Sequence, residues 1–522
     1  MKQLFFSLLL IVGMNHLGAQ TYCTSYGTSV SEFASAVCHT PDNGFVVVGS
    51  TQSMPNWDVL VVKYDSTGNV EWNRTIGMGQ AEDARSVAVA TNGDILVGGI
   101  TANGVSGISR MLVARLSPTG TVLWAEFISR GITERAWGIT ATADNGCIVV
   151  GDSHTAPFSS NSSKAYQVKL DSTGTILSSN IISLPAWAGN FGLSAVTTSP
   201  TNHVITTGQS TILSGGVGYP CLIKTKSNGL VVWKKEYQSN PYEHVLANSV
   251  CATADAYYIA GRWSGTPSFS TVIILKTDTN GNLIWAKKIA SSVNTEVSCI
   301  RATADGALIL SGQLSNNLNA QAGYVLKVDT AGNGLWGCYT PTGLCTTLPG
   351  ICEMNDGTFI AVGGQSNLTS VPANNMFIMQ VDANGNSCCG TAISFFSTTT
   401  LQFTANSIGT LMEGGERQVY FQQGTAGSDA PLCGLILANE QPAQEELHFA
   451  VYPNPANDAL SVTSENPVSR YEIYDVAGQL LMSEEQCGST LRIDVSAFSR
   501  GTYFLKIYSG ADIINSEFII VR

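Results

Sequence analysis

The stretch Lys63–Trp72, which reads Lys-Tyr-Asp-Ser-Thr-Gly-Asn-Val-Glu-Trp, decides the fold of this 522-residue chain. Alternating apolar residues lead into it, Asp65 and Gly68 have the chemistry of a tight turn, and Trp72 ends a second strand. Variants of this hairpin recur at Arg115–Trp124, Lys169–Ser178, Lys224–Trp233, Lys276–Trp285, Lys327–Trp336 and Gln380–Cys389. Steps of 52, 54, 55, 52, 51 and 53 residues separate Gly68, Gly120, Gly174, Gly229, Gly281, Gly332 and Gly385. This even period predicts a repeat architecture.

From Thr21 to Ser394, each period holds four short strand-like stretches separated by turn residues. In the first copy they are Ala34–Thr40, Phe45–Gly49, Asp58–Tyr64 and Asn69–Ile76. No helical periodicity interrupts the pattern, which predicts an all-β fold. Four-stranded antiparallel units bury their faces most simply by radial stacking, so we predict a seven-bladed β-propeller over residues 21–394. Tyr22–Ser25 aligns with the fourth strand of the repeat and is expected to complete the last blade.

The repeat resembles a family of exported bacterial propeller repeats. Asp42–Thr51, with the sequence Asp-Asn-Gly-Phe-Val-Val-Val-Gly-Ser-Thr, and the stretch Asp58–Asp65 carry the resemblance. It extends over about 370 residues of the chain. The resemblance implies the propeller fold and little about function, because one fold serves many tasks.

Composition narrows the choice of partners and compartment. With 12% charged residues and a formal net charge of −12, the chain lacks the basic surface that nucleic acid or anionic membranes require. Lys2, the apolar run Leu4–Met14 and the small residues Gly18-Ala19 predict a signal peptide over residues 1–19. No later apolar stretch approaches the 18 residues of a membrane-spanning helix. The expectation is an exported chain with no transmembrane span.

Cysteine spacing predicts disulfides rather than a metal site. The 13 cysteines are scattered, and none shows the paired spacing of a zinc site. Two pairings are candidates in an oxidising compartment: Cys338 with Cys345, and either Cys388 or Cys389 with Cys433. The turns Asp278–Asn282 and Asp382–Asn386 hold one carboxylate each, too few for a calcium cage. We therefore expect no metal and no cofactor.

Binding residues are expected on one face of the propeller. The connections between the second and third strands of each repeat are long and polar, and alternation places them on one face. Candidate contacts on that face are Trp57, Phe158, Tyr219, Arg262 and Trp263. The alternative is that these side chains only pack the loops.

The sequence shows no catalytic constellation. Gly151-Asp152-Ser153-His154 resembles the nucleophile block of GDS-type esterases, but no histidine has the Asp three residues before it that the partner block requires. Glu32, Glu82 and Glu134 are placed to line a channel mouth or to cap backbone amides. The cation at the end of the third strand recurs in six copies, which favours a structural role because a catalytic site is normally unique. No enzyme is predicted.

The chain ends in a second, small β domain, predicted as an Ig-like sandwich over residues 448–522 behind a closing segment and polar linker over 395–447. Its motifs include Tyr452-Pro453-Asn454-Pro455, Tyr474–Gln479 with Gly478, and Gly501–Lys506 with Tyr503. These motifs resemble the type A C-terminal sorting domain of the type IX secretion system of Bacteroidetes. The resemblance implies the secretion machinery as a partner, export across the outer membrane, removal of the domain and often attachment to surface lipopolysaccharide.

Three turns carry a short Asp-Ser/Thr signal similar to the O-glycosylation signal of exported Bacteroidetes proteins. The acceptors would be Ser66, Ser172 and Thr330. The alternative is ordinary turn chemistry, since Asp followed by Ser or Thr suits a hairpin.

These observations favour a secreted or cell-surface propeller that binds a glycan or protein ligand. The alternative is an enzyme, a hydrolase or lyase, that acts on extracellular polysaccharide. A single non-repeated cluster of acid, base and nucleophile at one channel mouth would discriminate between the two.

Overall fold

The computed structural model describes most of the chain between residues 21 and 520, and the chain divides into two compact units, Met1–Ile436 and Leu437–Arg522. The predicted signal peptide and most of the predicted linker lie outside the described residues. Other gaps are 29, 54–55, 78, 103–107, 130–132, 155–162, 184–187, 213–217, 239–243, 265–269, 291–292, 316–320, 342–344, 346, 366–374, 394–396, 402–403, 408–409, 414–415, 420–421, 425–427, 434–448, 453–457, 476–478, 510–511 and 521–522.

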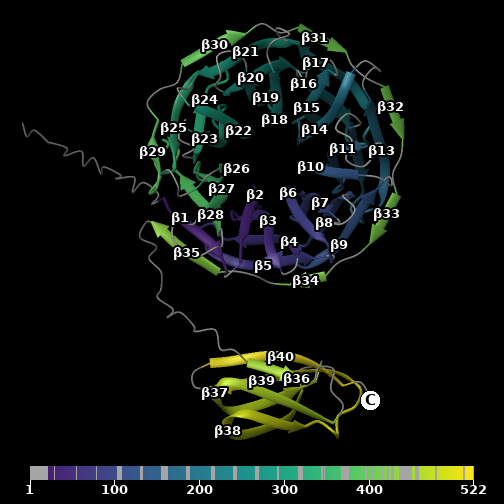
Figure 1. Cartoon of the computed structure of the whole chain (residues 1–522), viewed down its shortest axis with the longest axis vertical. Coiled ribbons are helices and arrows are strands. Elements are labelled where there is room, and N and C mark those ends of the chain that lie inside the picture. Colours follow the sequence, from purple (N-terminus) through teal and green to yellow (C-terminus); the bar gives the residue numbers. More distant parts are fainter. Residues whose placement is uncertain are drawn as a thin grey trace, which may run out of the picture. The chain divides into compact units, whose positions relative to one another are not determined.

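The described residues of the first unit form seven five-stranded antiparallel sheets, arranged radially around a central axis as a β-propeller (Figure 1). From the axis outward, the first sheet contains β2 (Glu32–His39), β3 (Phe45–Ser53), β4 (Asn56–Tyr64), β5 (Val70–Gly77) and β34 (Gln422–Gly424). The second sheet contains β6 (Ala81–Val89), β7 (Ile95–Ala102), β8 (Ser109–Leu116), β9 (Val122–Ser129) and β33 (Glu416–Val419). The third sheet contains β10 (Thr133–Ala141), β11 (Cys147–His154), β12 (Ser163–Leu170), β13 (Ile176–Ser183) and β32 (Thr410–Glu413), and the fourth contains β14 (Ala188–Thr198), β15 (His203–Ile212), β16 (Gly218–Lys226), β17 (Val231–Gln238) and β31 (Thr404–Ser407).

The fifth sheet contains β18 (His244–Ala252), β19 (Ala256–Ser264), β20 (Thr271–Asp278), β21 (Leu283–Ala290) and β30 (Ser397–Leu401). The sixth sheet contains β22 (Asn294–Ala302), β23 (Leu308–Ser315), β24 (Gln321–Val328), β25 (Gly334–Tyr339) and β29 (Thr391–Ala392). The last sheet contains β26 (Thr347–Glu353), β27 (Phe359–Gln365), β28 (Asn375–Val381), β1 (Cys23–Gly27) and β35 (Ser428–Cys433). The all-β prediction is confirmed, and no described residue belongs to a helix long and apolar enough to cross a membrane.

The repeated glycine is required for two physical reasons. Gly120 has a φ of 81°, which favours glycine, and a Cβ built on it would lie 2.8 Å from the indole of Trp72 in the preceding sheet. Trp72 Nε1 also donates a hydrogen bond to the carbonyl of Pro118 in the same turn, at 3.1 Å. The turn therefore joins neighbouring sheets as well as the two strands of its own hairpin.

The repeated cation at the end of the third strand is structural, as the sequence predicts. Lys63 is 1% exposed, and its ammonium group lies 2.9 Å from Asp42 and 2.8 Å from Glu71. Burial alone would raise the pKa of Asp42, but hydrogen bonds from Thr40 and Lys63 outweigh it and lower the pKa to about 2. The equivalent pairs Arg115–Asp94, Lys169–Asp144 and Lys327–Asp305 repeat this contact.

The propeller closes as predicted, with the N-terminal strand completing the last sheet. β1 pairs antiparallel with β28, and Cys23 lies opposite Met379. Closure of this kind hides the strand edges that an open array would expose. Tyr22 also takes the place of the repeated tryptophan, since its ring would lie 2.5 Å from a Cβ built on Gly68.

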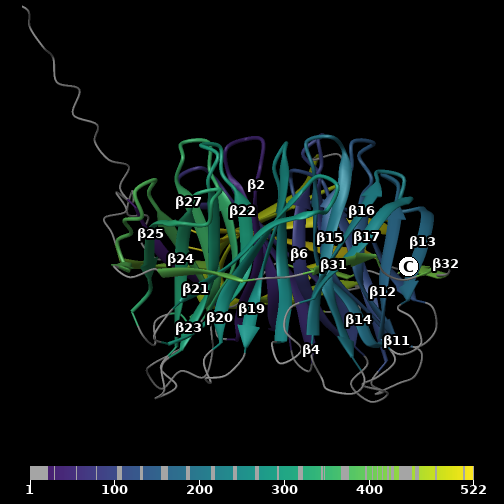
Figure 2. The ribbon, with the colours of Figure 1, turned by 90° about the horizontal axis from the view of Figure 1, so that it is seen from above.

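A segment that we call the belt, residues 391–433, encircles the propeller (Figures 1 and 2). Its strands β29 to β35 pair antiparallel with β25, β21, β17, β13, β9, β5 and β1, in the reverse of the order in which the chain builds the sheets. The sequence predicts four strands in each blade and a closing segment that closes or covers the last blade. The structure corrects both points, because every sheet receives a fifth strand from the belt.

The second unit contains β36 (Phe449–Tyr452), β37 (Ala459–Tyr474), β38 (Leu480–Asp494), β39 (Gly501–Ser509) and β40 (Asp512–Ile520) in one sheet. Its core includes Leu460, Ile473, Ile493 and Leu505. β37 and β38 are long strands that run on through irregularities in their pairing, between Thr463 and Val468 for example. Such bulges let a strand bend without ending.

Candidate functional site

The innermost strand of every sheet carries a β-bulge that places side chains in the central channel. In each strand the pairing register skips one residue at this point, or two in the last sheet, and β14 has a second irregularity between Ala188 and Phe191. The skipped residues that line the channel are Ser35, Arg85, Trp137, Ser194, Asn248, Ser298 and Pro349. Bulges commonly redirect a side chain towards a functional site. Here they surround a cavity of about 930 Å³.

Two of these seven channel positions differ from the others. Five hold small or short polar residues or proline, whereas the second and third sheets present Arg85 and Trp137. The guanidinium group of Arg85 lies 5.2 Å from the centre of the Trp137 ring, and that of Arg135 lies 5.5 Å from it. These distances are those of cation–π contacts. The cavity is therefore asymmetric, with one cationic and aromatic side.

Asp152 holds this side of the cavity together. Its Oδ2 accepts hydrogen bonds from Arg135 Nη2 at 2.7 Å and His154 Nε2 at 2.5 Å. Its Oδ1 accepts a bond from Trp137 Nε1 at 2.5 Å. Arg135 Nη2 also lies 2.8 Å from His154 Nε2. We call Arg85, Arg135, Trp137, Asp152 and His154 the channel-mouth cluster.

The charge state of Asp152 determines what this residue can do in the cluster. Burial alone would raise the pKa of this carboxyl, which is 4% exposed, but the hydrogen bond from His154 and the charge and hydrogen bond of Arg135 lower it below the usual value. Asp152 is therefore ionised at neutral pH with both oxygens engaged. It acts as a positioning residue that orients the guanidinium, indole and imidazole groups towards the cavity.

The cluster lies on the face where binding is predicted from the sequence. Asp152 and His154 stand at the end of β11, and Ser163 at the start of β12 lines the same cavity. The connection between β11 and β12 is one of the long second-to-third connections. A second ion pair, Arg85 with Asp83, borders the cavity, and Ser50 Oγ donates to Asp83 at 2.6 Å.

The esterase-like motif does not supply a nucleophile to this cluster. Ser153 is buried and donates a hydrogen bond to Glu134 at 3.2 Å, on the opposite face of β11 from Asp152 and His154. Glu32, Glu82 and Glu134 are fully buried and bonded to hydroxyl groups such as Thr51 and Thr101. They stabilise strand pairing and do not line the channel cavity.

Four of the five predicted loop contacts are described, and the structure does not bring these four together at one site. Trp57, Tyr219, Arg262 and Trp263 lie in strands rather than loops, because the strands extend into the predicted connections. Tyr219 and Trp263 are buried, Trp57 packs on Phe33 at 5.5 Å, and Arg262 pairs with Glu296 at 2.6 Å. Phe158 lies outside the described residues. A binding role for these side chains stays a prediction.

The channel-mouth cluster was missed because it combines three strands of two sheets. A signal for part of it exists in the repeat. The residue after the alanine in Glu-x-Ala is Ser35, Arg85 and Trp137 in the first three copies, so one position varies sharply inside a constant frame. Variation of this kind marks a position that packing does not dictate.

One of the two predicted cysteine pairings is contradicted by the structure. Cys23 and Cys389 form a disulfide, whereas Cys338 and Cys345 are buried free thiols. The prediction that Cys338 pairs with Cys345 is therefore wrong. Sequence spacing suggested it because the two are near neighbours, but they pack in the apolar interior beside Leu348 and Ile351.

The described sorting-motif residues have structural contacts. Tyr503 is largely buried, packs on Phe498 with ring centres 5.2 Å apart, and donates a hydrogen bond to the Ser499 carbonyl at 2.8 Å. Gly501 begins β39 and Tyr452 ends β36. Pro453, Asn454, Pro455 and Gly478 lie outside the described residues.

Comparison with known proteins defines the second unit as an export signal. Residues 450–521 match the family model described as the secretion system C-terminal sorting domain. The chain is therefore an exported β-propeller protein, directed by a type IX sorting domain to the cell surface or the medium. No match to a curated protein was found.

Solved structures similar to this chain share little sequence with it. The α-L-arabinanase of Penicillium chrysogenum is 11% identical with a TM-score of 0.40, over 57% of this chain and 92% of that one. The β-propeller domain of the Trilobed protease from Pyrococcus furiosus is 10% identical with a TM-score of 0.37, over 70% and 96%. PorZ, a surface component of the type IX secretion system of Porphyromonas gingivalis, is 10% identical with a TM-score of 0.24, over 96% and 100%.

The glycosylation signals lie on turns that are open to modification. Ser66 and Ser172 are exposed, while Thr330 is half-buried. We expect the native protein to carry glycan mass at Ser66 and Ser172, removed by Ser66→Ala and Ser172→Ala. Intact-mass spectrometry measures it. Thr279, in the similar turn Asp278-Thr279-Asn280 without the third signal residue, is the matched control, and an unmodified native mass would refute the prediction.

Proposed function

We propose that this protein is an exported binding protein whose ligand site is the channel-mouth cluster. The supporting observation is the break in the repeat: bulges in two neighbouring sheets present Arg85 and Trp137 to one cavity. Asp152 orients the Trp137 indole, and the guanidinium group of Arg85 lies over that ring. The proposal includes seven blades, one per copy of the repeat, and an Ig-like arrangement of the second unit. It extends to a surface lipopolysaccharide anchor, which the sorting domain alone does not specify.

The proposed ligand is a glycan that carries a carboxylate or sulfate group. A cavity of about 930 Å³ suits a short segment of a polymer rather than a folded protein surface. Guanidinium groups bind such anions with two parallel hydrogen bonds, and an indole offers an apolar face to a sugar ring. The serine, asparagine and glutamine side chains around the cavity, Ser35, Ser194, Gln209, Asn248 and Ser298, can bond sugar hydroxyls.

Replacing Arg85 by alanine is expected to weaken binding of an acidic oligosaccharide about tenfold, the loss of one charge-assisted contact. Arg85 is exposed, so the variant should remain folded. A glycan array with neutral and acidic members identifies the ligand, and calorimetry measures the dissociation constant.

The matched control is Arg74→Ala, which removes an arginine lying 5.7 Å from the ring of Trp72, far from the channel cavity. It should bind the oligosaccharide as the unaltered protein does. Equal binding by Arg85→Ala and the unaltered protein would contradict the proposal.

A second candidate is a lyase that acts on acidic polysaccharide. The observation that favours it is the imidazole of His154, oriented by Asp152 and adjacent to Arg135. In β-elimination, a base removes the proton next to a carboxylate whose charge is neutralised. The bond to the neighbouring sugar then breaks, and the leaving oxygen takes a proton from solvent. His154 would be the base, and Arg135 would neutralise the carboxylate. Incubating each bound polysaccharide and measuring ultraviolet absorbance of an unsaturated product, with His154→Gln as control, separates lyase from binder.

A further inference from the structure

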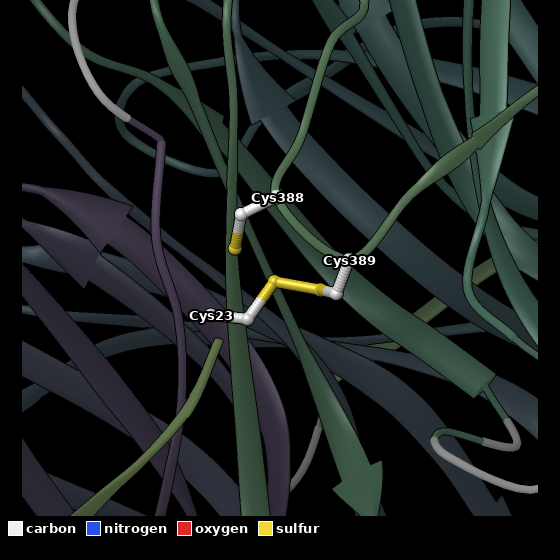
Figure 3. A group of neighbouring side chains, drawn as sticks. All are labelled: Cys23, Cys388 and Cys389. Atoms are coloured by element: carbon white, nitrogen blue, oxygen red, sulfur yellow. A yellow bond between two sulfur atoms is a disulfide. The ribbon is translucent and has the colours of Figure 1, made fainter. Parts of the chain in front are cut away.

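Several cysteines meet where the belt begins and ends. The sulfur atoms of Cys23, Cys388 and Cys389 lie within 4.8 Å of one another (Figure 3). Cys23 belongs to β1 and is joined to Cys389, just before the belt. At the other end of the belt, the pairing of β1 with β35 places Cys433 directly opposite Cys23. Residues far apart in sequence are therefore neighbours at this point.

The partner of Cys388 is one of two cysteines. Cys388 is itself in a disulfide. Of the 13 cysteines, eight are free thiols, and Cys23 and Cys389 are bonded to each other. Cys433 and Cys487 remain, and Cys487 belongs to the second unit. Residues opposite each other on paired strands have α-carbons about 4.5–5.5 Å apart, which brings the Cys433 backbone within disulfide reach of the cluster.

We propose that Cys388 and Cys433 form a second disulfide, which closes the belt into a covalent ring around the propeller. The ring encloses all seven sheets, because the belt pairs with the outer strand of each before it returns to β1. The Cys23–Cys389 bond then fixes this ring to the strand that closes the propeller. The inference is independent of the proposed ligand site.

The bond forms by exchange in the oxidising compartment that the exported chain crosses. Each thiol loses a proton, the two sulfurs join, and the two electrons reduce the disulfide of an oxidised thiol–disulfide exchange protein to a dithiol. The alternative for clustered cysteines is a zinc ion held by thiolates. Oxidation is favoured here because Cys23 and Cys389 are already bonded.

Cutting the belt tests the ring. A site-specific protease sequence inserted between β32 and β33 separates Cys388 and Cys389 from Cys433 and Cys487 after cleavage. The full chain, exported through an oxidising compartment and cleaved, should run as one species under denaturing conditions without reductant and as two with reductant. The variant Cys433→Ser should separate into two pieces without reductant.

Cys487→Ser is the matched control, and it should remain joined without reductant. The proposal is overturned if the unaltered cleaved protein separates without reductant, or if Cys487→Ser separates and Cys433→Ser does not. It is also overturned if the purified protein contains one equivalent of zinc and its cluster cysteines react as free thiols. Peptide mapping of the joined species supports it by linking the peptide with Cys388 to the peptide with Cys433.

Discussion

Deleting the belt, residues 391–433, is expected to lower the midpoint of thermal unfolding by roughly 10 °C and to cause self-association. Each outer strand, such as β21 or β17, loses a partner with which it pairs over four or five residues. Backbone hydrogen bonds contribute about 0.5–1.5 kcal/mol each after exchange with water, and the deletion removes such bonds from the outer strand of every sheet. The exposed edges also present unpaired amide and carbonyl groups to other molecules.

The control deletes a longer piece of the chain but leaves every sheet of the propeller intact. Deleting Leu437–Arg522 leaves the belt in place. The unfolding midpoint of this variant should match that of the propeller unit in the unaltered protein. Thermal unfolding followed by circular dichroism, with light scattering for association, measures both variants. Equal midpoints, with both variants monomeric, would show that the belt adds no stability.

Deleting His448–Arg522 is expected to abolish delivery to the surface almost completely, while the propeller stays folded and accumulates in the periplasm. The sorting-domain match covers 450–521, and the two units are separately compact. Separately compact domains fold and move independently. Cell fractionation with an antibody to the propeller measures the distribution.

The mature surface protein should end between about residues 438 and 452, the segment predicted as an exposed linker. Peptides from Ile473–Arg522 should be depleted in surface-released protein relative to propeller peptides. Equal abundance would mean that the domain is retained. As the reciprocal control, residues 437–522 fused to an unrelated exported protein should carry that protein to the surface.

The strands of the repeat were predictable because their determinants are local. Asp65 accepts hydrogen bonds from the amides of Thr67 and Asn69, and Gly68 has a φ of 89°, so one hairpin is specified within a few residues. The even period of the repeat then predicts the radial arrangement of the sheets. Even the closing strand was predictable, because Tyr22–Ser25 aligns with the fourth strand.

The belt was not predictable in the same way. Its strands are short, for example Thr410–Glu413 and Gln422–Gly424, and no Asp-Gly turn joins them. Each forms because the outer edge of a sheet is available, and that edge lies far away in sequence. The disulfide Cys23–Cys389 has a sequence separation of 366 for the same reason, since only closure of the propeller brings its ends together.

The channel-mouth cluster could be predicted from the sequence only in part. Asp152 and His154 are two residues apart and share one face of a strand, which the sequence shows. Their contacts with Arg135 and Trp137 depend on the bulge between Ala136 and Gly138, whose extra residue leaves no mark in the hydrophobic pattern. Register shifts of this size follow from packing between sheets, so they were visible only in the structure.

The belt also limits how many sheets the propeller can have. Each of its strands is assigned to one sheet in a fixed reverse sequence, from β29 on the sixth copy of the repeat to β34 on the first and β35 on the closing sheet. Duplication or loss of one 52-residue unit, an ordinary way for repeat proteins to change size, would leave a sheet without its outer strand or a strand without its sheet. Growth of this propeller therefore requires two matched changes at distant places in the gene, so its size is far harder to alter than that of a ring with no belt.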